Sequence, residues 1–240
     1  MNQIIKEMIE RKSVRQFRDQ PIAQSEKEWI LKAALNGPTA GNMNLFSIIE
    51  VNDQSMKETL AIQCDHQPFI AAAPYVLVFN ADYAKWETMF KKYASHPISL
   101  AESDLILAMN DAMIAAQNAV NAAWSQGIGS CYIGDILENY EENKILFHLP
   151  DHVVPVVMVV FGYPTDSQIN RKKPERFEQD LMVYENTYAS RDIEKAFQTQ
   201  SHKEDISKYI EAFAKRKFYA EFRAEMNRSV KSMLEDWKGE

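Results

Sequence analysis

Glycine is scarce in this sequence, with only seven residues among 240, and none of them completes a nucleotide-binding loop. Gly127, Gly129 and Gly134 do not fit the G-x-G-x-x-G spacing. They also follow a long helical pattern, whereas the dinucleotide fingerprint follows a strand. No P-loop is present either. These absences argue against a separate Rossmann domain and against P-loop chemistry. Gly127 is instead predicted to end the long helix in a left-handed conformation.

Cysteine is rarer still, because only Cys64 and Cys131 occur, far apart in apolar or mixed surroundings. Two such residues make no disulfide framework and no metal site, so we expect buried thiols and a reducing, cytoplasmic compartment. Of the five histidines, only His148 and His152 have helical spacing, and Pro150 separates them. The G-x-S-x-G elbow of many hydrolases is also missing. Metal-dependent and serine-hydrolase chemistry are therefore disfavoured.

The sequence also lacks an excess of positive charge and any long apolar run. Its formal net charge is -7 and its pI about 5.4, which argues against nucleic acid as a partner. No apolar run reaches the roughly 18 residues that suggest a membrane span. The first twenty residues are too charged for a secretory signal. We therefore expect a cytoplasmic protein without membrane or nucleic-acid partners.

Hydrophobic patterning predicts a mixed α+β fold with a substantial core, since 46% of the residues are hydrophobic. A capping box at Ser25 and Glu28 is predicted to open the second helix, and Asp53 to cap the third. Continuous apolar runs with β-branched residues predict buried strands. The expected helices cover 3–10, 25–37, 53–62, 99–127, 135–149 and most of the last fifty residues, and the expected strands 45–51, 74–80, 128–134 and 155–164.

The helix expected over 99–127 has no proline and no internal glycine, and would be roughly 37 Å long. Its apolar residues occupy more than one face, from Leu105 and Met109 round to Ala116 and Trp124. A helix that is apolar on several faces is buried on several faces. In a chain of this size a second copy would cover part of it, so the pattern predicts a homodimer.

Two short basic clusters stand out in this acidic chain, in irregular stretches beside proline or strand ends. Two interpretations stay open: solvated surface patches, or a local anion site in which several charge-assisted hydrogen bonds hold a phosphate. Composition does not say whether the clusters meet. They comprise Arg11, Lys12, Ser13 and Arg15, and Lys172, Lys173 and Arg176.

Six segments in fixed order resemble those of a known family. They read "RKSVRQF", "GPTAGNMNLF", "DAMIAAQNAV", "GIGSCYIGDI", "LPDHVVPVVMVVFGYP" and "KPERF" with "YENTY" after it. Together they cover about residues 5 to 190 and resemble the FMN-dependent nitroreductase and NAD(P)H flavin-oxidoreductase family, in particular its NADPH-preferring, nitroreductase A-like branch. One segment alone would be weak evidence; six in order are specific.

The resemblance implies a nitroreductase-like α+β fold with a central, mostly antiparallel sheet flanked by helices. The long central helix would lie at a homodimer interface, with FMN in clefts between subunits. Residues 1–190 would form the FMN-binding core, and residues 191–240 a helical C-terminal extension of the same domain.

The resemblance also implies FMN-binding positions, each carried over from a matching motif. The phosphate would be held at Arg11, Ser13 and Arg15 together with Lys173 and Arg176, with Lys12 as an additional cation. The flavin ring would be contacted at Thr39, Asn42, Asn44, Gln67, Tyr132, Ile133 and Gly134. Asn44 stands where the family often has glutamine. "KPERF" is one residue longer than the family's K-P-R form, with Arg176 as its arginine.

The implied activity is a ping-pong reduction of nitroaromatics, quinones or free flavin by NADPH or NADH. FMN N5 carries the hydride, so no catalytic side chain and no metal is assigned. Two alternatives stay open: a flavin-dependent, dehalogenase-like reductase, and an FMN-binding protein without reductase activity. A basic stretch of the extension would contact NADPH, or is simply a solvated helix face; it contains Lys215, Arg216, Lys217, Arg223 and Arg228.

Overall fold

The computed structural model describes residues 1–195, 197 and 205–239. The chain divides into two compact units, one made of Met1–Arg171 with Glu225–Glu240 and the other of Lys172–Ala224. The sheet and most helices belong to the first unit, whereas the second contains α9 (Gln179–Met182) and α11 (Ile206–Lys217). The family-core boundary expected near residue 190 stays a prediction.

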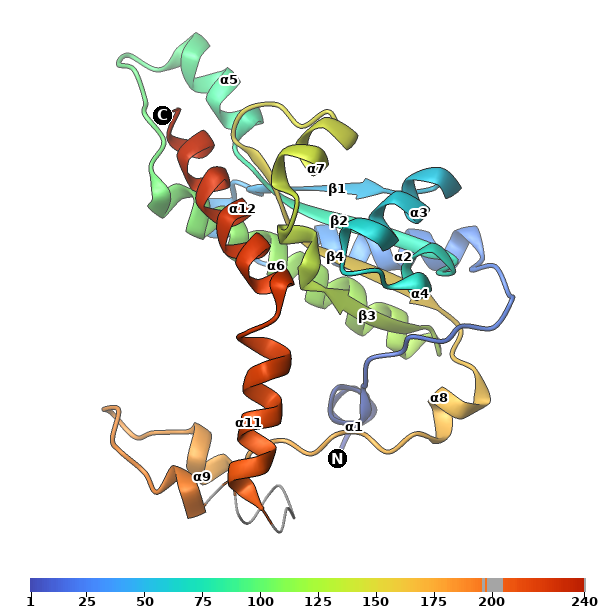
Figure 1. Ribbon diagram of the computed structural model, residues 1–240. Coiled ribbons are helices and arrows are strands. Elements are labelled where there is room, and N and C mark those ends of the chain that lie inside the picture. The colour runs from blue at the N-terminus through green and yellow to red at the C-terminus, as the bar shows by residue number, and fades with distance from the viewer. Residues whose placement is uncertain (196, 198–204, 240) are drawn as a thin grey trace. The chain divides into compact units, whose positions relative to one another are not determined.

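A four-stranded antiparallel sheet forms the centre of the first unit, in the order β1-β2-β4-β3 (Figure 1). The two central strands are the most apolar, and every residue of β4 is buried. This confirms the prediction of a mostly antiparallel sheet and of four strands at these places in the sequence. Their bounds are Phe46–Glu50 for β1, Tyr75–Asp82 for β2, Gly129–Ile133 for β3 and Val153–Gly162 for β4.

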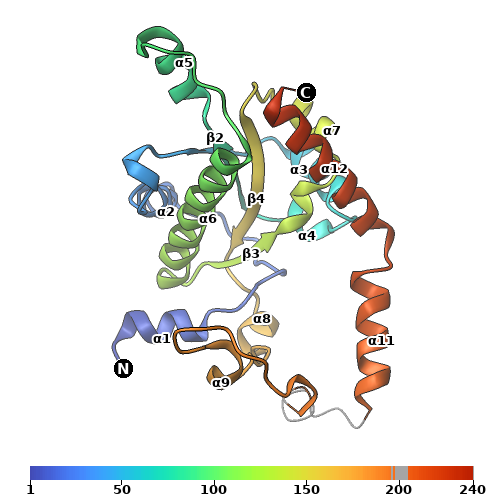
Figure 2. The same ribbon diagram turned by 90° about the vertical axis from the view of Figure 1, so that its left-hand side faces the viewer.

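Side-chain alternation along the strands divides the core into two clusters. In β2, Leu77 and Phe79 pack with residues of α2 and α6, whereas Val76 and Val78 pack with residues of α3 and α4. Both faces of the sheet are therefore covered, as the view along the sheet shows (Figure 2). The covering helices are α2 (Gln24–Leu35), α6 (Glu102–Ser125), α3 (Gln54–Gln63) and α4 (Pro68–Ala71).

The long helix α6 lies along one face of the sheet and is lined with small residues. Its alanines let the helix approach β2 and β4 closely. The helix starts later than the expected Ser99, because the Asp104 carboxylate accepts the N–H of Ala101 and so caps the first turn at 2.8 Å. Gly127 follows the helix with a φ of +74°, which confirms the predicted left-handed stop.

The structure corrects the predicted start of α2. The helix begins at Gln24, and the Glu26 carboxylate accepts the N–H of Ala23 at 2.8 Å. The capping role given to Ser25 and Glu28 was therefore wrong by two residues, because Glu26 is the acid that reaches the free N–H at this end. By contrast, the predicted Asp53 cap of α3 is confirmed, since its side chain accepts the N–H of Met56.

The single helix expected over 135–149 is in fact interrupted. A short 3-10 turn, η2 (Gly134–Leu137), is separated from α7 (Tyr140–Leu146) by Asn139 at a φ of +52°. Asn143 stabilises the break, because its side-chain amide donates to the carbonyls of Ile136 and Glu138 at 3.1 and 2.8 Å. Asparagine tolerates the left-handed region better than most residues, which is why the chain turns there.

Other helices complete the first unit: α1 (Gln3–Glu10), α5 (Ala84–Tyr93) and α8 (Asp166–Asn170). Helix α12 (Glu221–Lys238) returns to the sheet, where Met233 and Trp237 are buried. The Trp237 indole N–H donates to the carbonyl of Ala101 at 3.1 Å and ties α12 to the start of α6. Among the described residues, no helix combines the length and hydropathy that a membrane crossing requires.

Two glycines face each other across β3 and β4 and allow residues 11–17 to lie directly against the sheet. Gly129 and Gly162 are paired in register. A Cβ atom added to Gly129 would come within 2.6 Å of Val14, and one added to Gly162 within 2.6 Å of Phe17. Val14 donates its N–H to the carbonyl of Ser130 at 2.9 Å, so the segment also pairs with β3.

We therefore predict that Gly162→Ala destabilises the fold by about 1–3 kcal/mol, because the added methyl group has no room against Phe17 and Pro74. Urea unfolding of the ligand-free chain measures the effect. Gly134→Ala is the matched control, since a Cβ at Gly134 meets nothing within 4 Å. Equal unfolding midpoints for the two variants would contradict the close packing of residues 11–17.

Candidate functional site

A cluster of cations gathers where residues 11–13 meet residues 169–171. The Lys12 ammonium donates to the carbonyls of Ile169, at 2.6 Å, and Arg171. The Arg171 guanidinium in turn donates through Nη2 to the carbonyl of Ser13. Lys12 therefore joins the two segments, and Arg171, which sequence reasoning did not assign to the site, lies beside Ser13.

Two buried guanidinium nitrogens in this cluster have no hydrogen-bond partner among the described residues. They are Nη1 of Arg11 and Nε of Arg171. A buried N–H of a charged group is costly unless an acceptor meets it, and such donors suit phosphate oxygens. The donor set therefore fits an anionic phosphate group at this end of the site.

Arg15 and Ser13 lie beside the Cys131 thiol on β3. The guanidinium of Arg15 also stands over the Phe69 ring, 5.9 Å from its centroid. Burial raises the pKa of Cys131, although hydrogen bonds from Arg15 and Ser13 and the charge of Arg11 act in the opposite direction. The thiol is therefore protonated near neutral pH, which agrees with a packing role.

From the cationic cluster, β3 runs toward Gly134, which we call the open end of the site. Ile133 is buried, and Gly134 beyond it is exposed with open space where a side chain would stand. Burial raises the pKa of Tyr132 to about 12, although the positive charge of Arg11 acts to lower it. The Tyr132 hydroxyl donates a hydrogen bond to the side-chain oxygen of Gln117 at 3.1 Å. Four residues of strand span roughly 13 Å, so the site is elongated along β3.

Gln67 lies at this open end. Its amide nitrogen donates to the carbonyl of Cys64 at 2.8 Å and to the Asp135 carboxylate at 2.7 Å. The amide oxygen accepts no hydrogen bond from any residue that the structure describes. Gln67 can therefore offer a ligand an acceptor, whereas its two donors are already used.

The loop that carries Thr39, Asn42 and Asn44 is held by a buried acid. The Asp111 carboxylate accepts the N–H groups of Ala40, at 2.9 Å, and Leu45, at 3.0 Å. Asn42 and Asn44 are exposed, at φ values of +59° and +53°, and Thr39 accepts the N–H of Asn44 at 3.3 Å. The structure does not bring these three side chains into contact with the cationic cluster.

Lys173 and Arg176 belong to the second compact unit. Arg176 is exposed and donates to the carbonyl of Pro174 at 3.4 Å. Their part in the phosphate site stays a prediction, as do the roles given to the other FMN-binding positions. Three groups that position the site were missed: Arg171, Asp111 and Asp135. Asp111 and Asp135 lie within the segments "DAMIAAQNAV" and "GIGSCYIGDI" and so had a signal, whereas Arg171 precedes "KPERF" by two positions and lies in none of the six segments.

Comparison with known proteins identifies the family. The model of the nitroreductase family matches residues 8–163. The chain belongs to the nitroreductase family. An FMN reductase [NAD(P)H] of Bacillus subtilis is 32% identical over 213 residues, which cover 88% of this chain and 84% of that protein. An oxygen-insensitive NADPH nitroreductase of Salmonella typhimurium is 33% identical over 177 residues, covering 74% and 71%.

A structural comparison supports the same family. The NADPH:FMN oxidoreductase of Vibrio harveyi, complexed with NAD+, superposes with a TM-score of 0.82 at 25% identity and covers 97% of this chain and 98% of that one. The expected nitroreductase-like fold is thereby confirmed. Where the structure describes the chain, it contains no grouping of residues suited to holding a metal ion.

For this nitroreductase-family chain we predict that Asp111→Asn destabilises the fold by about 1–3 kcal/mol. An amide offers one acceptor oxygen, so a buried backbone N–H of Ala40 or Leu45 loses its partner. Chemical unfolding and faster hydrogen exchange at these two amides report the change. Asp53→Asn is the control, because asparagine caps helices as well as aspartate does. Unchanged exchange at both amides would show that Asp111 does not hold the loop.

Proposed function

We propose that this protein is an FMN-dependent NAD(P)H oxidoreductase that reduces nitroaromatics, quinones or free flavin. The observation that carries the proposal is the pair of buried, unpartnered guanidinium nitrogens of Arg11 and Arg171 beside β3. The relatives named FMN reductase and NADPH nitroreductase support the same chemistry. Arg15, Ser13, Lys173 and Arg176 would add further phosphate contacts.

When bound, FMN would supply the redox chemistry, namely hydride acceptance at N5 from NAD(P)H and two-electron transfer to an acceptor. The side chains bind and orient it. Arg11 and Arg171 would neutralise the phosphate, and the free amide oxygen of Gln67 would accept an N–H of the ring. The bare backbone at Gly134 leaves room for the ring at the open end of β3.

NADPH is the proposed reductant, on the strength of the relatives' names. Among the cations considered for its phosphate, Arg228 is already engaged, because it forms hydrogen bonds with Glu141 and Glu225 at 2.8 Å. In the second unit the guanidinium of Arg216 lies over the ring of Phe213, and that of Arg223 lies over the ring of Phe218. Each makes a cation–π contact.

A homodimer is proposed because a broad apolar surface is exposed among the residues that the structure describes. On α6, Ile106 is 59% and Met113 is 42% exposed, and they lie on one face at helical spacing. Neighbouring α1 adds four further apolar side chains, and such large patches mark interfaces. Those residues are Ile4, Ile5, Met8 and Ile9. A cytoplasmic location is proposed from the two free, buried thiols.

The test of the function is spectroscopic. The purified chain, loaded with FMN under nitrogen, should lose its yellow colour on addition of NADPH and regain it with a quinone or nitroaromatic acceptor. A yellow protein that NADPH does not bleach would be an FMN-binding protein without reductase activity. Turnover that requires a halogenated acceptor would favour the dehalogenase-like alternative. Failure to take up FMN would refute the proposal.

We predict that Arg11→Ala and Arg171→Ala each weaken FMN binding about ten- to hundredfold, from loss of one charge-assisted contact with the phosphate. Quenching of flavin fluorescence during titration measures the dissociation constant. Arg18→Ala is the matched control, since Arg18 is exposed and paired with Asp166 at 2.8 Å. An equal effect of all three variants would mean that general charge, not the site, holds FMN.

We further predict that Ile106→Glu combined with Met113→Glu converts the dimer to monomer and lowers FMN occupancy, because buried charges destabilise an apolar interface. Sedimentation velocity and the flavin-to-protein absorbance ratio give the two readouts. Ile145→Glu is the control, because Ile145 is 73% exposed on α7, outside α1 and α6. A double variant that stays dimeric would exclude this face as the interface.

A further inference from the structure

The amide of Gln67 is held in one orientation by two acceptors. Its nitrogen lies 2.8 Å from the carbonyl oxygen of Cys64 and 2.7 Å from Oδ2 of Asp135. Rotating the amide by 180° would place its oxygen against both acceptors. The free oxygen of Gln67 therefore points away from both acceptors, and without Asp135 the carbonyl of Cys64 alone would hold this orientation.

Glu138 lies next to Asp135 and is the most buried acid of this region. The residue is only 4% exposed, and its Oε1 has no hydrogen-bond partner among the described residues. Its backbone N–H donates to the carbonyl of Asp135 at 3.0 Å, and a side-chain hydrogen bond with Asp135 is one of the causes that raise the pKa of Glu138. Two carboxyl groups can share such a bond only when one of them carries a proton.

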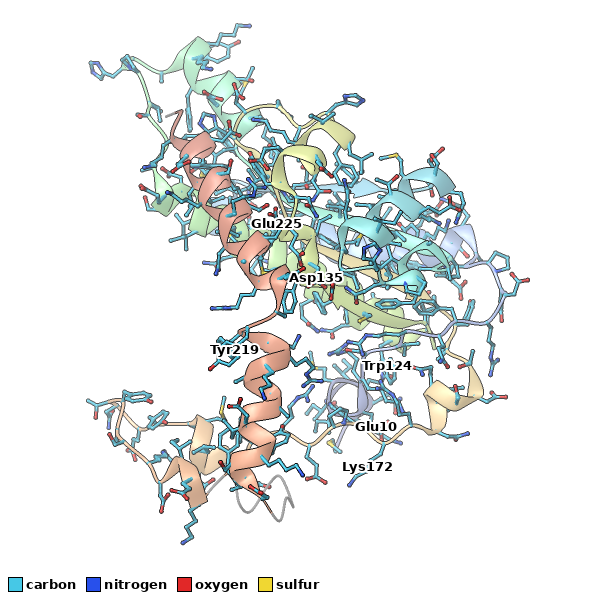
Figure 3. All side chains as sticks on the ribbon, viewed as in Figure 1. Glu10, Trp124, Asp135, Lys172, Tyr219 and Glu225 are labelled. Carbon is cyan, nitrogen blue, oxygen red and sulfur yellow. The ribbon has the colours of Figure 1, made fainter. Side chains whose placement is uncertain are left out.

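The groups that surround Glu138 favour the protonated form. Asp135 of η2, Asp65 of the turn after α3 and Glu225 of α12 all bring negative charge. Figure 3 labels Asp135 and Glu225. The nearby cation, Arg228, is engaged by Glu141 and Glu225. Burial first, and these three acids next, raise the pKa of Glu138 to about 7.

We propose that Glu138 and Asp135 share one proton and thereby fix Gln67 for FMN, so that the site responds to pH near neutrality. Glu138 is a positioning residue in this proposal, which rests on the proposed function. The Glu138 hydroxyl donates to one oxygen of Asp135, and Oδ2 accepts from Gln67. When Glu138 loses its proton, the donated bond disappears and two neighbouring carboxylates repel each other. Asp135, which is half-buried, then moves away and leaves the Gln67 amide held by the carbonyl of Cys64 alone.

The sign of the effect follows from proton binding. The ordinary pKa of Glu138 is 4.5 and the folded value about 7, so between these values the folded chain holds a proton that the unfolded chain has lost. The contribution to stability is fully present below pH 4.5 and is lost as pH rises to about 7. Glu138→Gln keeps a neutral donor toward Asp135 and should remove this loss.

The first arm of the test uses the FMN-free full-length chain. Urea unfolding midpoints are measured from pH 4.5 to 8.5 for the wild type, Glu138→Gln and Glu58→Gln. The difference between Glu138→Gln and the wild type should grow with pH up to about 7 and then level off. Glu58→Gln, an exposed replacement on α3, should follow the wild type. A constant difference between Glu138→Gln and the wild type would overturn the shared proton.

The second arm titrates FMN between pH 6 and 8.5. The wild-type dissociation constant should rise roughly five- to tenfold with pH relative to that of Glu138→Gln. Because the phosphate of FMN also titrates, variants are compared at equal pH. Asp135→Ala should bind FMN weakly at every pH, since alanine offers Gln67 no acceptor. Parallel pH profiles for the wild type and Glu138→Gln would overturn the coupling to FMN.

The two arms separate the possible failures. If no variant binds FMN, the proposed function is refuted and the coupling with it, while the unfolding arm still decides whether Glu138 and Asp135 share a proton. If FMN binds and both pH profiles are parallel, the proposed function survives and the pH response is refuted.

Discussion

The close approach of residues 11–17 to the sheet is the constraint on which the site depends. Gly129 and Gly162 are paired across β3 and β4, and neither has a side chain that would stand between the sheet and residues 11–17. Val14 fills that space, and in an extended segment its neighbours Ser13 and Arg15 point to the opposite side. The packing of Val14 thus fixes the position of Ser13 and Arg15 relative to β3. A bulkier residue at either glycine would move the whole segment.

The site along β3 is electrically asymmetric, which gives an elongated ligand one preferred direction. Arg11, Arg15 and Arg171 gather at one end, and Asp135 and Glu138 at the other. A ligand with one anionic end would meet acids if it bound in reverse, so repulsion adds to attraction in setting its orientation. A chain with a net charge of -7 would recognise phosphate in this way, because its cations are gathered locally and its acids would disfavour the reversed orientation of the ligand.

Much of the fold was predictable because local patterns determine it. The four strands and the long helix follow from apolar runs and from Gly127. The cap of α2 and the broken helix were not predictable, since each depends on which of several polar side chains reaches a free backbone group. The same holds for the site. Motifs indicated residues 11–15, but the partner Arg171 is chosen by tertiary contacts, whereas Lys172, Lys173 and Arg176 looked equally suitable in the sequence.

The break between η2 and α7, which the sequence analysis did not predict, lies close to the proposed site. A continuous helix over 135–149 would satisfy the backbone locally, yet Asn139 and Asn143 interrupt it. The interruption brings Asp135 to Gln67 and buries Glu138 among other acids, an arrangement that costs stability whenever Glu138 is ionised. Local preferences are usually consistent with the fold, and departures concentrate where function requires them. A buried acid without full hydrogen bonding is such a departure, and the orientation of Gln67 is what it stabilises.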